Sequence, residues 1–198
     1  MHDLAAHANR LDWHGLIDVI DLRAAWPEGP PAPADNAIAV AVHHDGVPAH
    51  VQNLNGDLDR IWSIHQHSEA QGWGPFPYQR IVSRAGRIFY TRDAGEEGAH
   101  IYHRNHIIKA VCGMGDFTQQ DPSTAQLCGM AAAIVMTYED IGSLAGVGPH
   151  KELAEPAHGD PWHSHATACP GGWAKWSPQL WPLLQFHARR LLDIRLDR

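Results

Sequence analysis

The chain has 198 residues, of which 44% are hydrophobic and 19% charged, and its formal net charge is −7 with only three lysines. This length and apolar content fit one globular domain with a core of its own, and they exclude a disordered chain. The acidic balance argues against a nucleic-acid partner, which needs a basic face, and no apolar run is long enough to insert into a membrane.

The N-terminal third predicts a helix, a connector and a strand. Apolar residues within 1–24 favour a helix. The segment 26–36 is rich in proline, which fixes φ and lacks an N–H, so we expect a stiff, non-helical connector. The short apolar run 37–44 ends in His43 and His44 and is typical of a buried central strand.

Helical and strand patterns alternate through the rest of the chain. They predict a helix over 58–73, a hairpin over 78–93 that turns at Arg-Ala-Gly-Arg, a strand over 106–115, a helix over 121–142 with Asp121 as its N-cap, and a C-terminal helix that opens at 177–178. This order predicts an α/β fold: a single domain with a central mixed β-sheet and helices packed on its faces.

Histidine and cysteine residues suggest a metal centre. A catalytic zinc takes three protein ligands from His, Cys, Asp or Glu and leaves a fourth position for water. His43 lies at the end of a predicted strand, and the segment 158–169 holds three histidines ahead of Cys169, so it can supply two further ligands. Cys112 and Cys128 lie in apolar segments and are expected to be small buried hydrophobic residues.

Four motifs between about residues 38 and 172 follow one another in a familiar order. They are VAVHHDG, GWGPFPYQRIVSRAGRIFYTRD, GAHIYHRNH and HGD…TACPGG. Together they resemble the zinc-dependent N-acetylmuramoyl-L-alanine amidases of type 2, a family that includes phage lysozyme-amidases and animal peptidoglycan recognition proteins. The resemblance implies the mixed-sheet fold of that family.

The resemblance also implies roles for the matching residues. His43 would be the first zinc ligand and Cys169 the last. Tyr78 would place its phenol beside the metal-bound water and the scissile carbonyl. Thr167 stands where the family has Lys or Thr, a group that hydrogen-bonds the developing oxyanion.

In the family, the remaining zinc ligand is the histidine of a Gly-His-Arg-Asp motif. In many family members this histidine precedes the cysteine by eight residues, and here Pro161 occupies that position. We expect His158 to be the ligand, because its His-Gly-Asp resembles the motif and the loop after it is lengthened. His163 and His165 are the alternatives.

Three further positions concern the surroundings of the metal. His100 and Asn105 match a pair that borders the muropeptide groove of the family. Asp45 departs from the family pattern, in which Thr or Ser usually follows the His pair. Because residues of this kind orient metal ligands, the change is expected to alter the groups around the site.

The implied activity is hydrolysis of the amide bond between N-acetylmuramic acid and L-alanine in peptidoglycan, by a monomer with one Zn²⁺ per chain. Residues 37–198 would form the amidase domain with its C-terminal helix, and residues 1–36 a helical extension with its connector. No secretory signal is visible, which favours a phage or prophage endolysin made in the cytoplasm that acts on the cell wall after release. A cytoplasmic muropeptide-recycling amidase and a non-catalytic peptidoglycan-binding protein are the alternatives.

Overall fold

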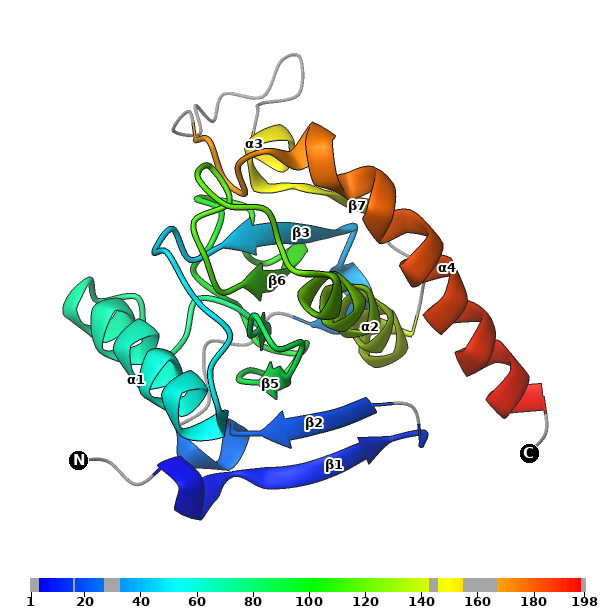
Figure 1. Cartoon of the computed structure of the whole chain (residues 1–198), viewed down its shortest axis with the longest axis horizontal. Helices are drawn as coiled ribbons and strands as arrows, with labels where there is room; N and C mark the ends of the chain where they lie inside the picture. Colours follow the sequence, from blue (N-terminus) through cyan, green and yellow to red (C-terminus); the bar gives the residue numbers. More distant parts are fainter. Residues whose placement is uncertain (1–3, 16, 27–32, 143–145, 155–166, 197–198) are drawn as a thin grey trace.

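The computed structural model describes residues 4–15, 17–26, 33–142, 146–154 and 167–196. Within these residues, seven strands form one mixed sheet with helices on both of its faces (Figure 1). The strands are β1 (Asn9–Trp13), β2 (Ile17–Asp21), β3 (Ala39–His44), β4 (Arg80–Val82), β5 (Ile88–Tyr90), β6 (Ile108–Gly113) and β7 (Gly146–Pro149). The helices are α1 (Leu54–Ala70), α2 (Thr124–Ile141), α3 (His150–Leu153) and α4 (Trp173–Leu196), with short 3-10 turns at Leu4–His7, Arg23–Ala25 and Ala34–Asn36.

The strand order, β1-β2-β5-β4-β6-β3-β7, places β3 between β6 and β7, and all three run parallel. Their carboxyl ends therefore meet at one edge of the sheet. His43 pairs in register with Cys112 of β6. On the other side Val42 pairs with Pro149, the last residue of β7. His150 comes next, so the register continues to a position opposite His43.

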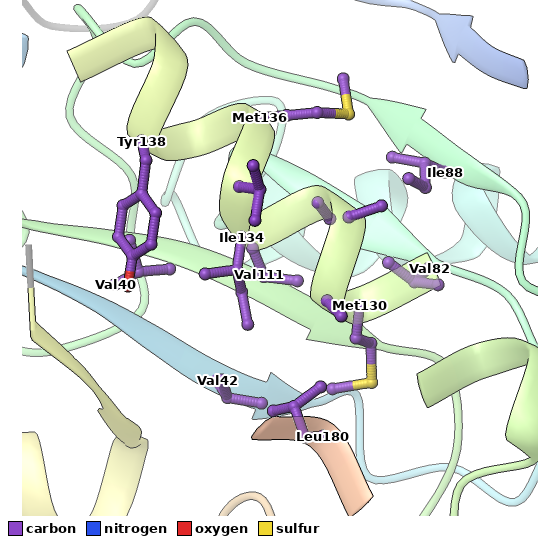
Figure 2. Packing of buried hydrophobic residues seen from close by; sticks show 14 of the residues in the cluster. Val40, Val42, Val82, Ile88, Val111, Met130, Ile134, Met136, Tyr138 and Leu180 are labelled. Carbon is purple, nitrogen blue, oxygen red and sulfur yellow. The ribbon is translucent and has the colours of Figure 1, made fainter. Parts of the chain in front are cut away.

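Two buried clusters, one on each face, fix the sheet between its helices. α2 is apolar nearly all round and packs on one face with α4 beside it. Figure 2 shows Met130 and Ile134 of this helix over Val42, Val111 and their neighbours. On the other face α1 buries Leu58, Ile61 and Ile64 against side chains of β4, β5 and β6. None of the helices in the described residues has the length and apolar character needed to cross a bilayer.

The elements predicted between residues 37 and 142 and the C-terminal helix are confirmed, with small changes at their ends. α1 begins earlier than expected, at Leu54. α2 begins at Thr124, because the Ser123 hydroxyl, rather than Asp121, accepts the N–H of Gln126. α4 begins at Trp173, four residues before the expected start.

The helix expected over residues 1–24 is wrong. Residues Asn9–Trp13 and Ile17–Asp21 form the antiparallel pair β1 and β2, and β2 joins the main sheet by pairing parallel with β5. Val19 packs in the cluster that contains α2, whereas Ile20 and Leu22 pack in the cluster that contains α1. The adjacent residues Val19 and Ile20 are both buried, one on each face of the sheet, so β2 lacks the strict apolar-polar alternation of a half-buried strand and its pattern was compatible with a helix. The domain boundary between residues 36 and 37 stays a prediction, and most of the proline-rich connector lies outside the described residues.

A buried arginine ties β4 to the end of α2. Arg80 is fully buried, donates from Nη1 to Thr137 Oγ1 at 2.8 Å and forms an ion pair with Asp140. Its guanidinium lies 4.2 Å from the ring centre of Tyr90, whose hydroxyl also donates to Asp140. The carboxylate of Asp140 therefore balances the buried positive charge.

We expect Asp140→Ala to lower the free energy of unfolding by about 3 kcal/mol, because it leaves a buried guanidinium without its carboxylate. This is the lower end of the usual range, since 28% of the Asp140 side-chain surface is exposed and water screens part of the loss. Arg80→Met removes the charge together with the need for a partner and should cost less. Urea unfolding of both variants makes the comparison, and an Asp140→Ala protein as stable as the parent would contradict it.

Candidate metal centre

Two histidines and a cysteine converge at the carboxyl end of β3. His43 is the fifth residue of that strand, and His150 opens α3 immediately after β7. Cys169 comes from the segment that precedes α4. One potential ligand atom from each of these residues lies within 4.8 Å of the other two. The parallel pairing of β3 with β7 thus brings together side chains more than a hundred residues apart.

The spacing of these atoms suits a tetrahedral metal ion. Cys169 Sγ lies 3.7 Å from His43 Nδ1, and the ring centres of His43 and His150 are 4.5 Å apart. Zinc bonds of about 2.3 Å to sulfur and about 2.0–2.1 Å to nitrogen, at a tetrahedral angle, separate the two ligand atoms by about 3.6 Å. Histidine nitrogen and cysteine sulfur are both zinc ligands, and three protein donors with one position left over match the arrangement of catalytic zinc sites.

Burial sets the protonation state of the three groups. Removal from water, together with nearby histidines, lowers the pKa of His43 well below its ordinary value. Burial likewise lowers the pKa of His150 to about 4 and raises the pKa of the Cys169 thiol to about 12. Both histidines are therefore neutral at pH 7 with lone pairs available, and the thiol keeps its proton until a cation displaces it.

Backbone hydrogen bonds hold the cysteine against both histidine-bearing segments. The N–H of His44 donates to Cys169 Sγ at 3.4 Å, and the N–H of Lys151 donates to the carbonyl oxygen of Cys169 at 3.0 Å. Thr167 Oγ1 accepts the N–H of Cys169 at 3.1 Å. The position of the sulfur is thus fixed by the end of β3, by the first turn of α3 and by its own loop.

Two further aromatic side chains surround His43. The ring of Tyr78, just before β4, lies 5.2 Å from the His43 ring, and the ring of His100 lies 5.1 Å away, edge-on. Burial raises the pKa of the Tyr78 phenol well above its ordinary value, so this hydroxyl stays protonated and can donate a hydrogen bond. Tyr78 also forms one wall of a pocket of about 400 Å³.

His100 lies in a loop shaped by Asn105. Asn105 Oδ1 accepts the N–H of His100 at 2.9 Å and that of Ile101 at 2.8 Å. Burial lowers the pKa of His100 to about 3. His100 therefore presents a neutral imidazole next to His43. Asn105 holds the backbone of the loop that carries His100.

Most residues expected at the site lie near one another. The structure brings together His43, Tyr78, His100 and Cys169, with Thr167 and Asn105 holding the loops beside them. His158, and the alternatives His163 and His165, lie outside the described residues, so a zinc ligand at position 158 stays a prediction.

His150 was missed from the sequence, although a signal for it was present. The triplet His-Lys-Glu at 150–152 keeps the histidine, basic, acidic order of the Gly-His-Arg-Asp motif. It also directly follows a strand, as His43 does. His150 precedes Cys169 by 19 positions rather than eight. Spacing alone therefore favours the histidines that lie nearer to Cys169.

The fold is shared with several solved structures, although neither a scan against protein-family models nor a search of curated proteins finds a match. Bumblebee PGRP-SA is 20% identical with a TM-score of 0.66, over 81% of this chain and 95% of that one. Peptidoglycan recognition protein-LE, solved with tracheal cytotoxin (a monomeric diaminopimelic acid-type peptidoglycan), is 20% identical with a TM-score of 0.65, over 83% and 94%. The N-acetylmuramoyl-L-alanine amidase LysC from Clostridium intestinale URNW is 16% identical with a TM-score of 0.58, over 78% and 93%.

Proposed function

We propose that this chain, which has the fold shared by N-acetylmuramoyl-L-alanine amidases and peptidoglycan recognition proteins, hydrolyses the amide bond between N-acetylmuramic acid and L-alanine with one zinc ion per chain. The observation that carries the proposal is the group formed by His43, His150 and Cys169 beside the Tyr78 ring. A protein that only binds peptidoglycan has no need of three such donors around one point.

His43, His150 and Cys169 would hold the zinc. An ion held there supplies Lewis acidity, which polarises a carbonyl group and makes a water molecule nucleophilic near neutral pH. The ligands themselves set the charge of the centre. Two neutral imidazoles and one thiolate leave a net charge of about +1 when they surround a divalent cation, and this favours an approaching carbonyl oxygen.

Tyr78 and Thr167 would stabilise the negative charge that develops on that oxygen. The raised pKa of Tyr78 keeps a proton on its phenol oxygen, which is the state required of a hydrogen-bond donor. Thr167 Oγ1 already accepts the N–H of Cys169, so its hydroxyl hydrogen can be directed toward the substrate. His100, neutral and buried beside His43, would border the groove, and Asn105 would shape the loop that carries it.

A phage or prophage endolysin, acting on the cell wall after release, is the biological role that we favour. The solved structures with this fold include an endolysin of a Thermus scotoductus bacteriophage, 18% identical with a TM-score of 0.54. A cytoplasmic muropeptide-recycling amidase would use the same centre on soluble substrates, and a binding protein would use the groove without catalysis.

The test identifies which bond the protein cleaves and in which substrate it cleaves that bond. Purified protein loaded with zinc is incubated with intact bacterial cell walls and with soluble muropeptides. We expect new alanine amino groups without new reducing sugar ends, released from intact walls. Release from soluble muropeptides alone would point to recycling, and binding without release would contradict the proposed hydrolysis.

A further inference from the structure

The pocket beside Tyr78 contains an arginine with an unusual partner. Arg60 of α1 and Asp45, which follows β3, both line this pocket together with apolar walls from Val47, Ile64, Trp73 and Pro77. The resemblance described above does not account for this pair, because the family usually has Thr or Ser where this chain has Asp45.

Asp45 holds the arginine from within the protein. Only 4% of the Asp45 side-chain surface is exposed. Its Oδ2 accepts from Arg60 Nε and Nη2, both at 2.8 Å. Its Oδ1 accepts the N–H of Gly115 at 2.8 Å and, more weakly, that of Val47 at 3.3 Å. Both carboxylate oxygens are thus engaged inside the protein, and the guanidinium is fixed along one of its edges.

The other edge of the guanidinium remains available to a ligand. The Arg60 side chain is 21% exposed, and no hydrogen bond joins its Nη1 to any residue that the structure describes. A guanidinium has five N–H donors in a planar fork that matches the two oxygens of a carboxylate. Because the buried Asp45 already orders this side chain, binding a second carboxylate loses less conformational entropy than it would at a flexible arginine.

We infer that Arg60 binds a carboxylate of the substrate in this pocket and that Asp45 is its positioning residue. The inference rests on the proposed function. Tyr78 borders both the pocket and His43, so the pocket adjoins the cleaved bond and the carboxylate belongs to a residue close after the alanine. The apolar walls suit the aliphatic stem of that residue. The preferred substrate is therefore a muramoyl peptide with an acidic, unamidated residue after L-alanine.

Two matched ligands test this assignment: N-acetylmuramoyl-L-alanyl-D-glutamate with its γ-carboxyl group blocked as the methylamide, and the α-amide of the same compound. They differ only in the α-carboxylate, because the γ-carboxyl group is blocked in both. Zinc-loaded protein is assayed for hydrolysis of each, and binding of each is measured by calorimetry on the metal-free protein. We expect the acid to be preferred in both readouts. Arg60→Gln should weaken binding of the acid and raise its KM about 10–100-fold, the usual effect of losing a hydrogen bond to a charged group. The amide should be nearly unaffected.

Two further variants separate recognition from folding. Arg60→Lys keeps the charge without the planar fork and should restore only part of the preference. Asp45→Asn should lower the preference for the acid while zinc content and thermal stability are followed in parallel. Equal treatment of acid and amide by the parent protein would overturn the inference. Selective binding of the acid through Arg60 without cleavage of either ligand would instead uphold it and contradict the proposed hydrolysis.

Discussion

Replacing His150 by alanine is expected to remove the bound zinc and to lower the rate of amide hydrolysis by about 10³-fold or more. The physical reason is that only His43 and Cys169 would remain as donors from the cluster, whereas a catalytic zinc needs three protein ligands. Loss of the metal forfeits several kcal/mol of transition-state stabilisation, which sets the size of the effect. Metal analysis of the purified variant, together with its rate on a muramoyl-L-alanine substrate, measures both consequences.

The matched control for this variant is His158→Ala. The sequence motif offered His158 as the ligand, and the residue belongs to the same stretch between α3 and Cys169. If His150 is the ligand, His158→Ala keeps one zinc per chain and its activity. Retention of zinc in His150→Ala, with its loss in His158→Ala, would contradict the assignment. Alanine variants at 163 and 165 complete the series.

Tyr78→Phe is expected to lower kcat by about 10²–10³-fold, the usual cost of removing one donor to a developing oxyanion. The substitution leaves the ring that packs 5.2 Å from His43 and removes only the hydroxyl. The loss should therefore fall on kcat and leave KM and thermal stability almost unchanged. Steady-state kinetics on the zinc-loaded variant provides the measurement.

The zinc content of Tyr78→Phe is the internal control. Because the phenol is not one of the three clustered ligands, this variant should retain one zinc per chain. An unchanged kcat would show that the hydroxyl takes no part in the reaction. A loss of zinc would show that Tyr78 supports the metal rather than the oxyanion.

The local sequence pattern was sufficient to predict the central strand that carries His43, but not the N-terminal strands β1 and β2. The apolar run 37–44 was correctly interpreted as a central strand because it was too short for a core helix. The segment from Ile17 to Leu22 was not, because its adjacent Val19 and Ile20 are both buried, on opposite faces, and break the alternation that distinguishes a half-buried strand from a helix. Pairing with the neighbouring β1 and with β5, about 70 residues away, decides its conformation.

The same limit explains why His43 and Cys169 were expected at the site and His150 was not. A histidine that ends a strand can be recognised locally, and a cysteine in a Pro/Gly-rich loop also stands out. His150 can join the site only because β7 pairs in parallel with β3. This pairing places His150 opposite His43. The number of residues between a histidine and Cys169 does not reveal this strand pairing, because the loop between them varies in length.

The most direct test of the zinc centre is a titration of metal-free protein with zinc while amide hydrolysis is followed. The account predicts no activity at the start, a linear rise and a plateau at one zinc per chain, with cleavage only between the muramoyl group and L-alanine. Activity that is complete before zinc is added, or a plateau reached equally by a His43→Ala, Cys169→Ala double variant, would contradict a catalytic zinc held by these residues.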